Sequence, residues 1–533
     1  MAINDTKLAH STSQSSPSPS CHHDNDIERH AQPTDIEHCN CVPVNHGNGP
    51  LARLRELEAK LDRKLGVESE AIVRLTPDQK VYQPWHQQAV MALMWASGTL
   101  QISCFATGLI GSQLGLNLRQ AIVTTVFGTL FGGMVSAYCA TMGPETGLRQ
   151  VSISRYSFGW WPSKIVAVLN VISQIGWATV CCITGGQALS AVSGGTVSIA
   201  LGIVIVGVGS LVVSFVGLRG VLAMDKYWWF VALVLILVGY GETGQYASTS
   251  TNATSSGASL SGTALSSKVL TLLAVVYGSS ASWCSIVSDY YAHYPIDTSK
   301  TKVFVLTTLG ISLPTMIGMC LGCIVGSAML TSRHDWADAY SSGNVAYVLL
   351  AMLHPTGWAK FSVVLLMLTG IACNCINLYS SALSIQQTTR LAARVPRFFW
   401  SLLVAGITIA LALAGRNKLL TVIQNLLALL GYWETSFFAI IITEHILFRK
   451  NSISNYNLEA WNDPSRLPIG IAGLFAFLVG FSGWMIGMVT TWYIGPVAQA
   501  VGGGGDVGNE LCLVFTFVAF VPMRYMELKW VGR

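Results

Sequence analysis

One acidic residue lies in the middle of a long apolar segment, where a carboxyl group could carry a proton. Glu434 occurs in LLGYWETSFFAII, among apolar, aromatic and hydroxyl side chains. An ionised carboxylate is costly in such surroundings, so Glu434 should be protonated, paired or next to a wet cavity. We interpret Glu434 as a candidate proton carrier. A structural hydrogen bond made by the protonated acid is the alternative.

Two amide side chains have the chemistry to recognise a heterocyclic base. Asn374 and Asn377 lie in the apolar stretch LTGIACNCINLYSSALS. A side-chain amide both donates and accepts hydrogen bonds, which suits the edge of a base, and a membrane-buried amide needs a partner. An ordinary hydrogen bond between helices is the alternative for either residue.

Two tryptophans could stack on the faces of a planar ring. Trp177 follows Asn170 and Gln174 at intervals of seven and three residues, so the three share one helical face. Trp283 lies in another apolar stretch, and stacking of a base on an aromatic side chain contributes about 1–3 kcal/mol. Membrane-interface anchoring and helix packing are the usual roles of single tryptophans, so the pair is informative only in combination.

These side chains need helices that hold them in a membrane. The chain has 533 residues, of which 52% are hydrophobic and 11% are charged, against the roughly 25% charged residues of a soluble domain. Its apolar runs are about 20 residues long, which matches the thickness of a bilayer core. The sequence therefore predicts an all-α membrane protein. The small net charge of +5 and the lack of a basic stripe argue against a nucleic-acid partner.

The apolar runs predict about twelve transmembrane helices. They lie near residues 89–111, 119–141, 164–189, 197–216, 224–241, 269–288, 303–330, 358–384, 398–415, 419–447, 468–491 and 510–529. Residues 1–50 are polar and of low complexity, which predicts a disordered tail. Residues 51–88 begin with leucines at helical spacing and are expected to form an amphipathic segment.

The distribution of basic residues predicts the orientation. Most Lys and Arg residues of the short connections follow the even-numbered spans or lie at the C-terminus. Cytoplasmic loops retain positive charge, so both termini, including the tail and the amphipathic segment, are expected in the cytoplasm. The connection 242–268 is then extracellular, and it carries a glycosylation sequon at 252–254.

Two spans are too polar for a plain lipid-facing helix. The first contains MWASGTLQISCFATGLIG and the sixth VYGSSASWCSIVSDYY. They begin two five-helix blocks, 89–241 and 269–447, as in transporters built from inverted repeats, whose broken helices expose backbone groups at the membrane midplane. Close packing of small residues is the alternative. Packing explains the glycines but not Gln101, Trp283 and Asp289 beside them.

From about residue 65 onward the chain resembles the nucleobase cation symporter 1 family, and within it the fungal purine-cytosine permeases. The similarity rests on KLGVESEAIVRL, the first-span motif, GPETGLRQVSISRYSFG, SDYYAHYPIDTSK, NLYSSALSIQ and EHILFR taken together. It implies a LeuT-like fold of two inverted five-helix repeats plus two C-terminal helices within 468–533. It also implies a plasma-membrane importer of cytosine and of purines such as adenine, guanine and hypoxanthine, driven by protons.

The resemblance also implies roles for individual residues. Trp177 and Trp283 match the tryptophans that contact the substrate, and Asn377 matches the asparagine that hydrogen-bonds the base. Ser97 and Ser103 fall in the first-span stretch that lines the site. The chain departs from the pattern at Cys181, where an asparagine is usual, and at Ile376, where a proline is usual. Because a thiol cannot replace an amide, these departures put the substrate preference in question.

The same resemblance bears on the coupling ion. In sodium-driven relatives, two hydroxyl side chains shortly before the substrate asparagine bind the ion. Those positions are Ile371 and Ala372 here. The sequence therefore favours coupling to protons over sodium, without an organic cofactor or a resident metal.

Other classes of protein have different signatures. No His-rich metal cluster, nucleophile elbow or pair of catalytic carboxylates indicates an enzyme. A receptor that binds nucleobases without moving them, and a carrier of uracil, allantoin, a vitamin or a nucleoside, stay open as alternatives. The preferred base and the oligomeric state are likewise left open.

Overall fold

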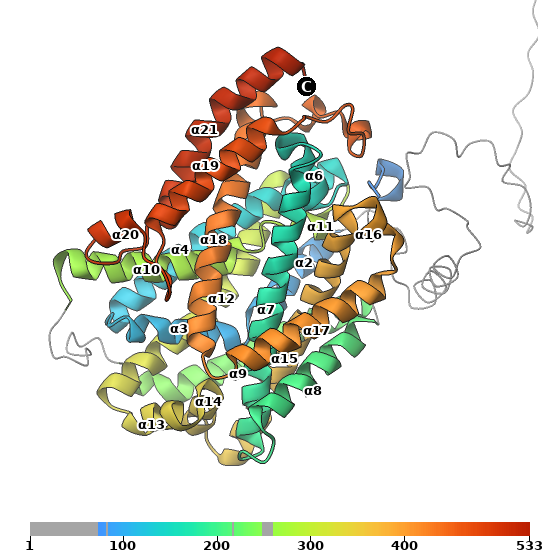
Figure 1. Ribbon diagram of the computed structural model, residues 1–533. Coiled ribbons are helices and arrows are strands. Elements are labelled where there is room, and N and C mark those ends of the chain that lie inside the picture. The colour runs from blue at the N-terminus through green and yellow to red at the C-terminus, as the bar shows by residue number, and fades with distance from the viewer. Residues whose placement is uncertain (1–72, 81–83, 216–217, 248–259) are drawn as a thin grey trace, which may run out of the picture. The chain divides into compact units, whose positions relative to one another are not determined.

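The computed structural model describes residues 73–80, 84–215, 218–247 and 260–533. The predicted tail 1–50, the leucine-rich helix expected from residue 51 and the sequon at 252–254 lie outside these ranges. The described residues form helices joined by short connections (Figure 1), and their one β-bridge pairs Val489 with Ile494.

Every predicted span coincides with a helix or a pair of helices. In chain order these are α2 (Trp85–Thr99) with α3 (Ile102–Gln113), α4 (Leu118–Ala140), α7 (Ser163–Val192), α8 (Ile199–Ser214), α9 (Leu218–Thr243), α10 (Gly262–Ala281), α12 (Lys300–Thr331), α15 (Thr356–Thr388), α17 (Arg397–Gly415), α18 (Leu419–Thr443), α19 (Ile471–Gly487) and α21 (Gly508–Val531).

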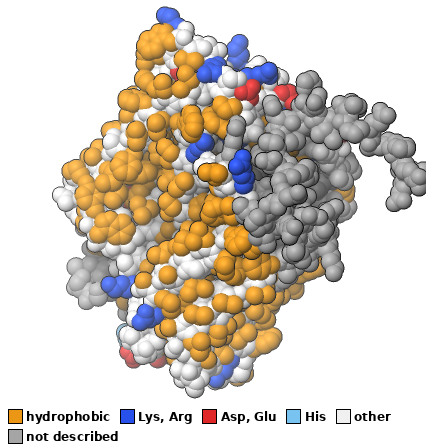
Figure 2. All heavy atoms as spheres, turned by 45° about the vertical axis from the view of Figure 1, so that its right-hand side comes forward, with side chains coloured by type: hydrophobic (Ala, Val, Ile, Leu, Met, Phe, Trp, Pro, Cys, Tyr) orange, Lys and Arg blue, Asp and Glu red, His pale blue; other side chains and the backbone are white. Residues whose placement is uncertain are grey.

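Length and composition support a membrane location for these helices. In the described part of the chain, nine helices are long and apolar enough to cross a bilayer, the bent pair α2 and α3 counts as a tenth, and α8 and α19 are shorter apolar helices. The predicted all-helical membrane fold is confirmed, whereas the number twelve stays a prediction. Large apolar side chains are exposed on these helices, among them Phe131, Leu402 and Val518. Figure 2 shows such side chains over much of one face.

Short helices connect the long ones. They are α5 (Met142–Thr146), α6 (Gln150–Phe158), α11 (Ser288–Tyr291), α13 (His334–Gly343), α14 (Val345–Met352), α16 (Arg390–Arg394) and α20 (Pro496–Ala500), and a π-helical turn, Glu444–Phe448, extends α18.

The two interrupted spans are interrupted in the structure. The chain bends by 60° between α2 and α3, because Gln101 adopts an extended backbone conformation. The second helix, α10, ends at Ala281 and is followed by turns over residues 282–287 before α11. The Gln101 side chain donates a hydrogen bond to the Gly98 carbonyl (3.0 Å), so part of the polar backbone freed by the first break is satisfied.

Glycines also bring helices together. A Cβ atom on Gly108 of α3 would lie 1.9 Å from the Met319 carbonyl oxygen of α12, and one on Gly278 of α10 would lie 1.9 Å from the Leu427 carbonyl oxygen of α18. Neither position accepts a larger residue without separating the helices. Small-residue packing therefore operates beside the helix breaks, and it draws α18 close to α10.

The long helices pack in pairs that are distant in sequence. The most extensive contact joins α7 to α15, and α10 packs between α4 and α18. The C-terminal helices α19 and α21 run side by side (Figure 1).

A buried charge network ties α21 to α18. Arg524 is fully buried and donates to both oxygens of Glu444 (2.8 and 3.0 Å) and to Glu527 (3.1 Å). Glu444 also accepts from Arg449 (2.9 Å), and Glu527 accepts from the Gly470 amide (2.8 Å). The network thus fastens the ends of α18 and α21 to the start of α19.

We expect Arg524→Ala to destabilise the protein by about 3–5 kcal/mol, because it leaves two carboxylates in a buried site without their shared cation. Thermal unfolding of the detergent-solubilised protein, followed by fluorescence-detected size exclusion, measures the loss. Arg524→Lys keeps the charge and should lie between wild type and alanine. An alanine variant as stable as wild type would show that the network contributes little.

Candidate functional site

The register between α7 and α15 places the predicted site residues. Near one end of the contact, Gln101 bridges two thiols: Cys181 of α7 donates to its amide oxygen (3.5 Å), and its amide nitrogen donates to Cys373 of α15 (3.4 Å). Eleven residues away on each helix, Asn170 of α7 donates to Ser384 of α15 (2.7 Å). The helices are therefore antiparallel neighbours, held by polar contacts at two levels.

This register puts Trp177 at the level of Asn377, between the two polar contacts. Trp177 donates its indole N–H to Ser282 (3.1 Å), at the start of the turns that follow α10. Asn377 is buried, and its amide nitrogen has no hydrogen-bond partner among the described residues. A buried amide N–H without a partner is unfavourable unless a ligand or water completes it.

Trp283 follows Ser282 directly and faces the first helix break. A Cβ atom on Gly98 would lie 3.4 Å from the Trp283 ring, and Trp95 of α2 contacts Trp283 edge to face with 5.3 Å between ring centroids. Ser97 is buried next to Gly98. Trp177, Trp283 and Ser97 thus border the two breaks, and the α7–α15 register places Asn377 at the level of Trp177.

The other predicted substrate residues lie around this group. Cys181 is buried and engaged with Gln101, while Ser103, two residues beyond the break, has a buried hydroxyl that lacks a described partner. Asn374 turns toward α7 and donates to the Cys182 thiol (3.5 Å), and its amide oxygen is unsatisfied in the described part of the chain. The substrate-binding roles of these residues stay predictions.

Two residues of the site escaped prediction from sequence. Cys373 and Ser282 gave no signal, because a buried thiol or a serine in an apolar span looks like a packing residue. Gln101 did give one, since an uncharged amide within an apolar span is costly without partners.

Asp289 proves to lie away from this group. Its carboxylate accepts from Arg149 (3.2 Å) and from the Gln150 amide (2.8 Å), on the segment between α5 and α6. Burial raises the pKa of Asp289, and the Arg149 charge opposes that shift. Asp289 therefore holds α11 to the segment between α5 and α6.

Glu434 is fully enclosed on α18. Neither of its carboxyl oxygens has a hydrogen-bond partner among the residues that the structure describes. The Ser285 hydroxyl lies beside the carboxyl group, in the turns between α10 and α11. Next to Glu434 on α18, Trp433 donates to Ser173 of α7 (3.1 Å), which fixes α18 against the helix that carries Trp177.

A polar chain connects the surroundings of Glu434 to the indole site. Ser285 donates to the Asn170 amide oxygen (3.0 Å), and Gln174 donates to the same oxygen (3.2 Å). Asn170 in turn donates to Ser384. The chain joins the turns after α10 to α7 and α15, and Gln174 lies one helical turn before Trp177.

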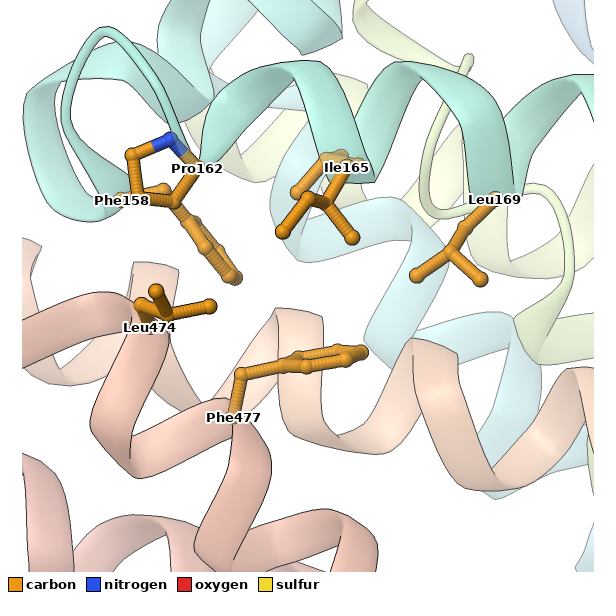
Figure 3. A pocket seen from close by; sticks show the side chains of 7 residues that line it. Phe158, Pro162, Ile165, Leu169, Leu474 and Phe477 are labelled. Carbon is orange, nitrogen blue, oxygen red and sulfur yellow. The ribbon is translucent and has the colours of Figure 1, made fainter.

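A hollow between α7 and α19 has a different character. Phe158, Pro162, Ile165, Val166, Leu169, Leu474 and Phe477 line it (Figure 3). These side chains are all apolar, so the hollow offers no group that would orient a polar heterocycle. Nor do three or more His, Cys, Asp or Glu side chains of the described residues group as a metal site.

Sequence comparisons match the chain to known permeases. The family model described as permease for cytosine/purines, uracil, thiamine, allantoin matches residues 85–500. The vitamin B6 transporter TPN1 of Saccharomyces cerevisiae is 31% identical over 95% of this chain and 96% of its own. The purine-cytosine permease fcyB of Emericella nidulans is 33% identical over 92% of this chain and 93% of its own. These relatives are transporters rather than enzymes.

Solved structures share the fold. Mhp1, a nucleobase-cation-symport-1 family transporter, matches in a closed conformation with bromovinylhydantoin bound (TM-score 0.59, 15% identity, 85% of this chain and 94% of Mhp1). Its inward-facing conformation matches with a TM-score of 0.61, 15% identity and coverage of 87% and 95%. The predicted LeuT-like fold class is thereby confirmed.

Proposed function

The chain belongs to the family of permeases for cytosine/purines, uracil, thiamine and allantoin, and we propose that it imports a nucleobase in symport with protons. The substrates that we propose first are cytosine and the purines adenine, guanine and hypoxanthine. A multi-pass membrane transporter of this family fits the helices described above.

The observation that carries the substrate proposal is an unpartnered amide, Asn377, at the level of Trp177, with a second indole, Trp283, directly after the serine that Trp177 contacts. Trp177 lies on α7 and Trp283 in the turns after α10, and both border Ser282. The Asn377 amide nitrogen lies at the same level and can donate to a ring nitrogen or carbonyl of a base. A planar base between the indoles would gain about 1–3 kcal/mol from stacking and would satisfy the amide.

Glu434 supports coupling to protons. An ionised carboxylate enclosed without a partner costs several kcal/mol, so these surroundings favour the neutral acid. Among the described residues, the neighbours that act on Glu434 include no basic side chain. The positions where sodium-driven relatives carry hydroxyl ligands are Ile371 and Ala372. Neither side chain has an oxygen for sodium, which prefers oxygen ligands.

A second substrate class is a substituted pyridine of the vitamin B6 type. TPN1 matches nearly the whole chain at an identity close to that of the purine-cytosine permeases. Where the purine-cytosine permeases usually have an asparagine, this chain has Cys181. Its thiol is already hydrogen-bonded to Gln101. A pyridine ring has the same flat faces as a base but fewer polar edge groups, so it depends less on such an amide.

The distribution of basic residues supports an orientation with both termini in the cytoplasm, and we place this importer in the plasma membrane. Epitope tags at the two ends of the chain should then be stained only after the cells are permeabilised. Staining of either tag on intact cells would overturn the orientation.

Uptake tests the function. Radiolabelled cytosine, adenine, hypoxanthine, uracil, allantoin and pyridoxine are given to yeast that lacks the corresponding transporters and expresses this chain, at pH 5 and pH 7, with and without sodium. The proposal expects acid-stimulated uptake of cytosine or a purine that is unchanged without sodium.

Uptake that collapses when sodium is removed at constant pH would overturn the coupling ion. Uptake of pyridoxine alone would select the second substrate class. A protein that is present at the surface but transports none of the six compounds would contradict both classes.

We expect Cys181→Asn to widen the range of bases accepted. The new amide can donate and accept, and it replaces a thiol that makes weak hydrogen bonds. One added hydrogen bond is worth about 0.5–1.5 kcal/mol, which predicts roughly two- to tenfold tighter competition by purines in the uptake assay. Cys182→Asn is the matched control, because Cys182 faces Asn374 instead of Gln101. Unchanged or weaker competition by purines would place Cys181 outside base recognition.

A further inference from the structure

We propose that Ser285 is a hydroxyl switch that transmits the protonation state of Glu434 to the substrate site. The inference rests on the proposed function, in which Glu434 holds the transported proton. It adds a positioning residue that links the proton to the base.

Ser285 is placed between the two sites. It lies in the turns over residues 282–287, two residues after Trp283 and three after Ser282. Its hydroxyl is beside the Glu434 carboxyl and donates to Asn170. Because this segment has no regular helix, a small change at Ser285 can be passed along the backbone to both substrate-site residues.

The switch follows because the Ser285 hydroxyl can donate only one hydrogen bond at a time. A serine hydroxyl has one hydrogen to donate. In the structure that hydrogen is directed to the Asn170 oxygen, and we assign this arrangement to the neutral Glu434. An ionised carboxylate accepts hydrogen bonds about twice as strong as neutral ones do, and neither Glu434 oxygen accepts from another described residue. Loss of the proton therefore turns the Ser285 hydroxyl from Asn170 to Glu434.

The turn of this hydroxyl has consequences at the indoles. The Asn170 amide oxygen accepts hydrogen bonds from Ser285 and Gln174. It would lose the bond from Ser285 and keep the bond from Gln174. The Ser285 backbone would be drawn toward α18, together with the adjoining Trp283. Substrate affinity should then be high with Glu434 protonated and low with Glu434 ionised, which is the order that symport requires.

Other titratable groups around Glu434 do not compete for this role. Those that act on it electrostatically are Cys139 of α4, Cys284 beside Ser285 and Tyr277 of α10. Thiols and phenols are neutral at the pH where a coupling carboxyl changes charge. Ser285 is therefore the neighbour through which the charge of Glu434 is transmitted.

Binding of radiolabelled adenine, and of pyridoxine as a second probe, to the purified full-length protein from pH 5 to pH 8 tests the switch. Wild-type affinity should fall at least tenfold over this range. Glu434→Gln and Ser285→Ala should both bind independently of pH, whereas Ser285→Thr keeps the hydroxyl and should follow wild type. Ser280→Ala is the matched control, because Ser280 lies on α10 with a buried hydroxyl that lacks a described partner.

The outcomes separate the two proposals. If Glu434→Gln keeps the wild-type pH dependence, or if wild type itself shows none, Glu434 is not the proton site and the proposed coupling fails with the switch. If Glu434→Gln is flat but Ser285→Ala follows wild type, only the switch fails. Should Ser285→Ala not yield folded protein, Ser285→Cys retains the shape with a weak donor. A flattened profile then supports the switch, and a wild-type profile overturns it.

Discussion

We expect Glu434→Gln to abolish concentrative uptake while leaving exchange of substrate across the membrane. Glutamine has the shape of the protonated acid but cannot release a proton, so the proposed cycle loses its driving force. A voltage of ~100 mV and one pH unit together supply about 3.7 kcal/mol per proton, which allows an accumulation of about 500-fold. The variant should equilibrate substrate and accumulate none.

Proteoliposomes with an imposed pH gradient and voltage measure accumulation, and counterflow of labelled substrate measures exchange. Glu242→Gln is the matched control, because Glu242 is a partly exposed carboxyl near the end of α9. Accumulation that survives in Glu434→Gln would remove Glu434 from coupling. Loss of counterflow as well would assign it to substrate binding or folding.

Asn377→Ala removes the amide that we assign to the base. Two neutral hydrogen bonds contribute about 1–3 kcal/mol in total, and loss of 3 kcal/mol weakens binding by roughly 150-fold. Uptake of submicromolar cytosine or adenine should therefore fall below detection. Trp283→Ala should give a similar loss, since stacking contributes about 1–3 kcal/mol per base.

Surface expression distinguishes recognition from folding in both variants. A protein that reaches the plasma membrane but no longer binds confirms a direct role, whereas loss from the surface would make the residue structural. Trp358→Ala provides the matched tryptophan control, because Trp358 lies in the first turn of α15, far along that helix from Asn377. Normal uptake by Asn377→Ala would contradict the assignment.

The positions of the helices were predictable because a membrane helix depends on the residues of one continuous segment of the sequence. A run of apolar residues must form a helix to satisfy its backbone in lipid, so each predicted span coincides with a helix or a pair of helices. The two breaks were also predictable, since small and polar residues cluster at 97–101 and 279–285.

The partners of the polar side chains were not predictable in the same way. Asn374 and Asn377 lie on one helix with similar neighbours, yet only Asn374 reaches the Cys182 thiol. Gln101 meets Cys181 and Cys373 although these residues are far apart in the chain. The register of α7 against α15 decides such contacts, and packing over the whole length of both helices sets that register.

The amino-acid sequence by itself determined that the chain spans a membrane, where two of its helices break, and that Glu434 is a carboxyl group in an apolar segment. These properties depend on the free energy of placing each segment in lipid, which is a sum over local residues. Only the tertiary structure decided that Glu434 lies beside Ser285, and that Ser285 hydrogen-bonds Asn170. Such meetings arise where α18, α7 and the turns after α10 converge, because side chains from distant segments become neighbours only when helices pack.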